Sequence, residues 1–157
     1  MKMSNSLLLE DFTLNYPNMR VSRFSLKVGE KIPLHVHQNQ FGLAYLIQGR
    51  CLVTSYVVNK TNDDLFLLTL DKKQELLQHS YCILTPQVNA HEIYAHEDSI
   101  FLDIFAPGNN GERISDYLKV VSDKNGSQLT AIKMSSEETK LLASHLLNDS
   151  NKHLEIS

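Results

Sequence analysis

Short apolar segments separated by polar turns fill the middle of the chain. In residues 19–29, MRVSRFSLKVG, the side chains of Phe24, Leu26 and Val28 alternate with polar ones, which is the period of a β-strand. Comparable segments rich in leucine, β-branched and aromatic residues follow, bounded by turn-forming residues: 42–49, 51–58, 65–70, 80–86, 91–98 and 99–108. Strands of this length and spacing predict a β-sandwich or a closed β-barrel.

The C-terminal part of the chain predicts one more hairpin and then a helix. Two strand-like runs, residues 116–121 and 128–134, flank the turn sequence SDKNGS. Ser135 and Glu138 then have the spacing of a helix capping box, and leucines follow at helical spacing. We therefore expect a single domain over residues 1–157, with an N-terminal lead-in (1–20), a β-barrel (21–134) and a C-terminal helix packed on the barrel (135–149).

Composition places the chain among ordinary soluble domains and narrows its partners. The 157 residues are 42% hydrophobic and 21% charged, with a formal net charge of −3. This charge gives no reason to expect nucleic acid or an anionic membrane as a partner. No stretch has the length and hydropathy of a signal or membrane-spanning segment. The two cysteines, Cys51 and Cys82, do not form a CxxC pair, so we expect small core residues and a cytoplasmic protein with reduced thiols.

Two histidines in EKIPLHVHQNQFG, residues 30–42, are the first candidates for chemistry. In a strand, His35 and His37 point to the same face, and Pro33 favours an extended segment over a helix interior. Burying two imidazoles without partners costs free energy, whereas a divalent metal satisfies both. A surface strand with two solvated histidines is the alternative, and the pair alone does not decide between them.

His91 is the best third ligand, because it opens the predicted strand 91–98 and can enter the same cavity from a neighbouring strand. We expect the other histidines on the surface: His79, His96, His145 and His153. Phe41 stands four positions after His37, where many barrel metal sites carry a glutamate. The leading interpretation is therefore a site of three histidines without a carboxylate, whose positive charge favours an anionic ligand such as a thiolate beside dioxygen.

Asp103 is the second candidate for chemistry. It lies inside the apolar segment SIFLDIFAPG, on the same predicted face as Phe101 and Phe105. A carboxylate among aromatic rings requires a partner. One interpretation is a salt bridge or hydrogen bond at the rim of the sheet, and the other is a group near the metal that accepts the amine of a substrate.

Taken together, these segments resemble the thiol dioxygenases of the cysteamine dioxygenase and plant cysteine oxidase type, which belong to the cupin superfamily. The matching pieces are IPLHVH, Gly49 twelve residues beyond His37, SY at 55–56, NAH at 89–91 and FLDIFAP at 101–107. The HxH pair is common to cupins in general. The more specific signal is NAH followed, twelve residues after its histidine, by the aspartate of FLDIFAP.

The resemblance implies an all-β fold, the cupin double-stranded β-helix or jelly-roll barrel, with a C-terminal α-helix. It also implies an Fe(II) enzyme that adds both atoms of dioxygen to a thiol and forms a sulfinic acid, although another divalent metal can occupy such a site in a purified sample. By this analogy His35, His37 and His91 bind the iron, and Asp103 helps to position the substrate. Tyr56, in the matched SY, is the tyrosine best placed to line the cavity.

The sequence departs from the family pattern after DIFAP, where the family continues with a second proline and a tyrosine. Asn109 stands where that tyrosine would fall. Together with Phe41 and Tyr56, it is a residue that we expect near the substrate. A free cysteine substrate would also need a cation for its carboxylate. We expect Arg20 and Arg23 to be solvated, which favours an amino-thiol without a free carboxylate, either cysteamine or the N-terminal cysteine of a peptide.

Two further function classes stay open at this point. One is a cupin metalloenzyme of another class, such as an isomerase or a dioxygenase of carbon substrates. The other is a non-catalytic cupin that binds a ligand. The sequence leaves open the thiol, the pathway and whether the protein is a monomer or a homodimer.

Overall fold

The computed structural model describes residues 10–16, 18–106 and 116–142 of the chain, and for residues 10–16 and Lys60 it describes the backbone alone. The described strands, in chain order, are β1 (Glu10–Tyr16), β2 (Met19–Leu26), β3 (Lys31–Val36), β4 (Phe41–Gln48), β5 (Cys51–Lys60), β6 (Leu65–Leu76), β7 (Tyr81–Leu84), β8 (Ala90–Ala95), β9 (Ser99–Ala106), β10 (Asp116–Lys124) and β11 (Gln128–Lys133). A helix follows, of which residues 136–142 are described. No described helix is long and apolar enough to cross a membrane.

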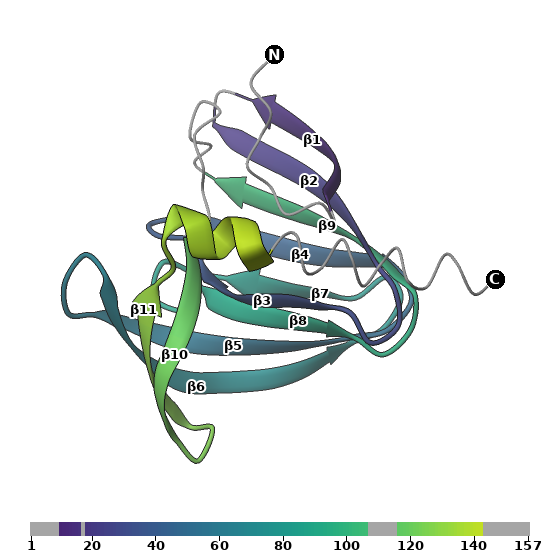
Figure 1. The fold of residues 1–157 in the computed structure, drawn as a ribbon. Coiled ribbons are helices and arrows are strands. Elements are labelled where there is room, and N and C mark those ends of the chain that lie inside the picture. The colour runs from purple at the N-terminus through teal and green to yellow at the C-terminus, as the bar shows by residue number, and fades with distance from the viewer. Residues whose placement is uncertain (1–9, 17, 107–115, 143–157) are drawn as a thin grey trace.

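The strands form two layers (Figure 1). One is a five-stranded sheet in the order β1-β2-β9-β4-β7, and the other closes on itself in the order β10-β11-β6-β5-β8-β3. All strand pairs are antiparallel. The two layers pack with apolar faces toward each other. This packing buries the apolar side chains of strands in which apolar and polar residues alternate, and thereby stabilises the fold.

Two large apolar clusters and a small third one, Leu84 with Phe105, lie in the interior. The first lies between the layers, because it joins buried side chains of the five-stranded sheet, such as Leu46 and Phe101, to Val53 and Ile93 of the closed layer. The second is built almost entirely from strands of the closed layer: Leu34, Val36, Tyr56, Phe66, Leu68, Ala90, Leu118, Leu129 and Ala131. Phe105 of the small cluster stacks on His37.

The predicted hairpins and the helix start are confirmed. β5 pairs with β6, and β10 pairs with β11 across a loop of residues 125–127, in which Asn125 and Gly126 have the positive φ angles, 57° and 70°, that asparagine and glycine tolerate in turns. At the helix start the Ser135 backbone N–H donates to the Glu138 carboxylate at 2.9 Å, and the Glu138 N–H donates to the Ser135 hydroxyl at 3.1 Å. These reciprocal bonds are the predicted capping box.

The N-terminal boundary of the barrel differs from the sequence-based prediction. The expected lead-in, residues 1–20, contains β1 and the start of β2. Both strands extend the five-stranded sheet beyond β9. The rest of the predicted helix, residues 143–149, lies outside the described residues.

Candidate metal centre

His35 and His91 face each other across neighbouring strands. β3 pairs with β8 so that the two histidines are direct partners, and each is almost completely buried. The pairing of β3 slips between Ile32 and His35, at a bulge that accommodates Pro33, a residue without a backbone donor. After this slip His35 points into the molecule, in the same inward direction as His91.

His37 lies one residue beyond the end of β3. Its backbone N–H donates to the carbonyl oxygen of Asn89 at 3.0 Å, which ties it to the residue before β8. The residue is 2% exposed, and its ring centroid lies 4.7 Å from that of His35. The close HxH spacing and the start of β8 therefore bring all three histidines together, as the sequence predicts.

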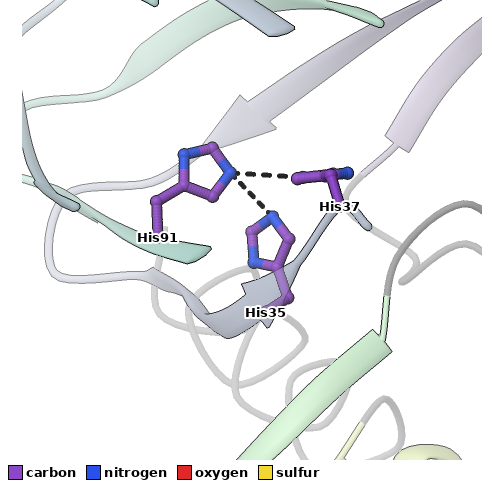
Figure 2. Close-up of side chains that lie close together, drawn as sticks. All are labelled: His35, His37 and His91. Carbon is purple, nitrogen blue, oxygen red and sulfur yellow. Dashed lines mark hydrogen bonds between the residues drawn. The ribbon is translucent and has the colours of Figure 1, made fainter. Parts of the chain in front are cut away.

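The three imidazoles converge through their Nε2 atoms (Figure 2). The Nε2 atom of His91 lies 2.8 Å from that of His35 and 3.3 Å from that of His37. A metal held by two nitrogens at about 2.1 Å and at right angles keeps those nitrogens about 3.0 Å apart. The two spacings from His91 are close to this value, and the donor atoms of all three histidines lie within 4.8 Å of one another, so the group could hold a metal ion.

The hydrogen bond of His35 fixes which of its nitrogens can bind. Its Nδ1 lies 2.7 Å from the carbonyl oxygen of Pro33. A carbonyl only accepts, so Nδ1 carries the proton and Nε2 keeps a lone pair directed at the other two rings. Orientation of a ligand imidazole by a backbone carbonyl is a common feature of metal sites.

Burial keeps the cluster neutral. It lowers the pKa of His35 from its usual 6.5 to about 4, against a smaller upward effect of the bond to Pro33. The pKa values of His37 and His91 are also lowered, mainly by burial and then by the charge of His35. Neutral imidazole is the form that binds metal, so the site is ready for a metal ion at neutral pH.

Within the part of the chain that the structure describes, no carboxylate joins the group. Among the described residues, these three histidines are the one set of histidine, cysteine, aspartate and glutamate side chains whose donor atoms cluster, all within 4.8 Å of one another. Of the other histidines, His79 is exposed and His96 half-buried, and both lie away from the group. His145 and His153 lie outside the described residues.

Phe105 forms one wall of the site. Its ring stacks on His37 with centroids 3.8 Å apart and an interplanar angle of 21°. The ring occupies space left by Gly42 on β4, where an added Cβ would lie 2.2 Å from Cε1 of Phe105. Tyr117 of β10 lies on the other side, paired with His35 and with its ring centroid 5.4 Å away.

Asp103 is buried on the face of β9 that carries Phe105 and Phe101, as the sequence predicts. Across the sheet it pairs with Ser22 on β2 and with Ala44 on β4. Cys82 follows in the same row. Burial, reinforced by the negative charge of Asp103, raises the pKa of Cys82 to about 12, so this cysteine stays a protonated core thiol.

Two of the three residues expected near the substrate lie elsewhere, and the third is not described. Phe41 is 60% exposed on the outer face of β4, because the inward position is that of Gly42. Tyr56 belongs to the second apolar cluster. Ser55, the residue before Tyr56 in β5, is instead the direct partner of His91. Asn109 lies outside the described residues.

Arg20 corrects another expectation. It is half-buried and lies on the inner face of β2, in phase with the buried residues Ser22 and Leu26, whereas Arg23 is exposed as expected. The positive charge of Arg20 contributes to lowering the pKa of His37, after the larger effects of burial and of the other two histidines. Arg20 and Tyr117 are thus the neighbours of the histidines that sequence reasoning missed. The alternation of apolar and polar side chains along residues 19–29 would have indicated that Arg20 points inward.

A double-layered β-fold with inward-facing histidines at one end of its core defines the class, which is a cupin with a candidate metal centre. Its solved structural neighbours include a double-stranded β-helix protein from Klebsiella pneumoniae (21% identity, 69% of this chain and 80% of that chain, TM-score 0.49). A cupin superfamily protein from Desulfitobacterium hafniense is 18% identical over 64% of this chain and 81% of its own, with a TM-score of 0.45. An RmlC-like cupin from Shewanella frigidimarina is 14% identical over 62% and 75%, with a TM-score of 0.48.

The family is more specific than the fold. The model of the cysteamine dioxygenase and plant cysteine oxidase family, PCO_ADO, matches residues 14–154. The chain therefore belongs to this family, as the resemblance found in the sequence predicted. No curated protein matches the chain.

Proposed function

We propose that the protein is an iron(II)-dependent thiol dioxygenase that converts an amino-thiol and dioxygen to a sulfinic acid. The observation that carries this proposal is the convergence of three neutral histidines, without a carboxylate, in a chain of the PCO_ADO family. Cysteamine and an N-terminal cysteine are the substrates that the sequence favours. Free cysteine is the third amino-thiol to compare.

The overall reaction balances without another reductant. A thiol and dioxygen give a sulfinate and a proton, RSH + O₂ → RSO₂⁻ + H⁺. The sulfur loses four electrons, dioxygen gains four, and both oxygen atoms end on sulfur. Iron(II) would supply open coordination positions at which the thiol sulfur and dioxygen come within bonding reach.

The protein's own residues have three tasks in this proposal. His35, His37 and His91 hold the iron through Nε2 and add no negative charge, so the site favours an anionic sulfur ligand. Phe105, stacked on His37, keeps water from one side of the site. Asp103, on the same strand face as Phe105, accepts the ammonium group of the substrate.

The test is oxidation of thiols by the iron-loaded full chain. We expect dioxygen uptake and a product 32 mass units heavier with at least one of cysteamine, free cysteine and a peptide that begins with cysteine. Absence of a sulfinic product from all three would overturn the proposal and favour a cupin of another class. Metal analysis of protein purified without added metal then separates another metalloenzyme from a non-catalytic cupin.

Asp103→Asn tests the proposed role of the carboxylate. We expect iron to stay bound and the KM for amino-thiols to rise, with a smaller effect on 2-mercaptoethanol, which has no ammonium group. An unchanged ratio between the two thiols would assign Asp103 a purely structural role, such as a hydrogen bond within its row of the sheet.

We further propose that the whole chain acts as one cupin domain in the cytoplasm, as a monomer or homodimer, without nucleic acid or a membrane as partner. Cys51 and Cys82 support a reducing compartment, since both are free and buried. Size-exclusion chromatography with light scattering and fractionation of cells address these points.

A further inference from the structure

We propose that Ser55 is a positioning residue of the candidate metal centre: its hydroxyl accepts the Nδ1–H of His91 and thereby aims the Nε2 atom of His91 at the metal. This inference rests on the metal site of the function proposed above, and it does not depend on which thiol is oxidised. The resemblance found in the sequence drew attention to Tyr56, whereas the serine before it is the residue that faces the site.

Ser55, His91 and His35 form one row across three neighbouring strands of the closed layer. β8 lies between β5 and β3. His91 of β8 is the direct partner of Ser55 on one side and of His35 on the other. Because direct partners on neighbouring strands point to the same face, all three side chains turn toward the same interior. Ser55 is 2% exposed, so its hydroxyl lies inside the molecule.

The rest of this face of the β5–β8 ladder is apolar. Val53 pairs with Ile93, two residues along from the serine and the histidine. Cys51 pairs with Ala95, two residues further. These four side chains are buried in the first apolar cluster. A serine and a histidine therefore face each other on an otherwise apolar face, where a polar group without a partner costs free energy.

The Nδ1 atom of His91 requires an acceptor. The Nε2 atom of this ring points at the other two histidines, so Nδ1 carries the proton when Nε2 binds a metal. Figure 2 shows Nδ1 on the side of the ring that is turned away from His35 and His37. Nδ1 is buried, and it has no hydrogen-bond partner among the described residues. A buried N–H without an acceptor is unfavourable, and Ser55 flanks His91 on the side opposite to His35.

The Ser55 hydroxyl suits this acceptor role. The Cβ atoms of direct partners lie about 4.5–5.5 Å apart, so rotation about the Cα–Cβ bond of Ser55 brings Oγ into reach of Nδ1. A hydroxyl accepts such a bond and still has its own proton to donate. Asn89, two residues before His91, offers another buried acceptor, its Oδ1 atom. Its amide, however, is held in the turn by the bond to the Pro86 carbonyl, which leaves Ser55 as the acceptor that faces His91 directly.

The experiment uses zinc(II), a divalent ion without redox chemistry, so that the result does not depend on catalysis. The full chain carries isotope-labelled histidine, and NMR spectra of the zinc-loaded protein report each ring N–H. In the wild type we expect a slowly exchanging Nδ1–H resonance of His91 with a nuclear Overhauser contact to the β protons of Ser55. Ser55→Ala should shift this resonance upfield and speed its exchange with solvent. The His35 N–H, which is bonded to the Pro33 carbonyl, should not change.

Competition with a chelator measures the zinc affinity of the same proteins. Ser55→Ala should lower it about 10- to 100-fold, the usual range for loss of a partner that orients a metal ligand. Ser55→Thr, which retains a hydroxyl, should keep most of the affinity. Thr54→Val is the matched control, because it removes a buried hydroxyl from the opposite face of the same strand. It should leave the affinity and the His91 resonance unchanged.

Equal zinc affinity and an unchanged His91 resonance in Ser55→Ala would overturn the inference. If Ser55→Ala fails to fold, the wild-type spectrum decides, because absence of the contact between the His91 N–H and Ser55 overturns the inference as well. Failure of the proposed function looks different. If no thiol is oxidised while the zinc-loaded protein gives the expected spectra, only the dioxygenase activity is refuted. If thiols are oxidised while Ser55→Ala binds zinc like the wild type, only the role of Ser55 is refuted.

Discussion

At the scale of single residues, Gly42 shapes the site by leaving space for the side chain of another residue. The Phe105 ring fills the volume that a side chain at position 42 would need, and from there it stacks on His37. A glycine at a close approach in a strand is thus the condition for an aromatic wall beside the candidate metal centre.

Gly42→Ala should displace the Phe105 ring, because the new Cβ would lie 2.2 Å from its Cε1 atom. We expect a loss of about 1–3 kcal/mol in the free energy of unfolding, measured by denaturant titration, and weaker metal binding. Phe105→Leu in the same background should restore part of the stability. A fully additive double mutant would show that the clash is not the cause.

His91→Ala should abolish stoichiometric iron binding, because the Nε2 atom of His91 lies within 3.3 Å of both other Nε2 atoms. Metal analysis after dialysis measures this. His79→Ala is the control, since His79 is exposed and lies outside the cluster, and it should bind iron like the wild type. Full iron occupancy in His91→Ala would mean that the third ligand is another residue.

The sequence predicted the buried positions correctly for residues whose chemistry limits where they can lie. Three histidines and one aspartate, in or directly next to apolar strands, need partners, and the structure buries them all. Phe41 and Tyr56 were assigned to the wrong side because a strand changes face with every residue, so the inward positions are those of Gly42 and Ser55. A glycine and a serine give no chemical signal that would reveal this.

At the scale of elements, the turn between β7 and β8 positions two of the histidines. The Asn89 carbonyl holds the backbone of His37, and β8 begins directly after this residue with His91 at its second position. The Asn89 side chain is buried, and its amide donates to the Pro86 carbonyl at 2.9 Å, closing the turn. The asparagine of NAH therefore acts on the metal centre through the backbone.

Asn89→Ala should loosen this turn, because the Pro86 carbonyl loses its donor. We expect about 1–3 kcal/mol less stability and a lower affinity for metal, measured by competition with a chelator. Gln87→Ala in the same turn is the control, since Gln87 is exposed and its backbone oxygen, which the substitution keeps, accepts from Val58. Equal metal affinity in the two variants would argue against a role of Asn89 in positioning.

The bulge in β3 was not predictable from the sequence. A regular strand puts Leu34 and Val36 on one face and His35 on the other, yet all three side chains are buried. Both faces of the strand meet an interior, because Leu34 and Val36 belong to the second apolar cluster, whereas the His35 ring contacts those of His37 and His91. Pro33 marked an extended segment, whereas the slip in pairing depends on partners far away in the chain.

At the scale of the whole molecule, the buried histidines couple folding to pH. In the metal-free protein their pKa values lie below the 6.5 of an exposed histidine, with that of His35 at about 4. The unfolded chain therefore binds more protons than the folded protein below pH 6.5. The contribution of these histidines to the free energy of unfolding is fully present above this pH and is lost progressively as the pH falls toward 4.

Chemical denaturation of the metal-free protein at pH 7.5, 6 and 5 measures this loss. His35 alone should contribute a slope of up to about 1.4 kcal/mol per pH unit between pH 6.5 and 4. His35→Gln should make the dependence shallower without removing it, because His37 and His91 remain, and the exposed His79→Ala should leave it unchanged. A pH-independent stability over this range would contradict the burial of neutral histidines.

The strands of the fold were predictable, whereas their pairing was not. Alternating patterns and turn residues located β2, β4, β5, β7 and β9. No local pattern states that β9 lies between β2 and β4, because that order depends on contacts between distant segments. The family resemblance supplied the cupin architecture. The place of Arg20 beside Phe105 follows only from the observed pairing.

The bond between His35 and the Pro33 carbonyl has a consequence for how such a site can change. The acceptor belongs to the main chain, and every amino acid supplies a carbonyl. Substitutions of the surrounding side chains therefore leave this orienting contact in place. The orientation of the His35 ring therefore does not depend on which side chains line the site. The side chains around the site can therefore change while the Pro33 carbonyl keeps His35 aimed in the same direction.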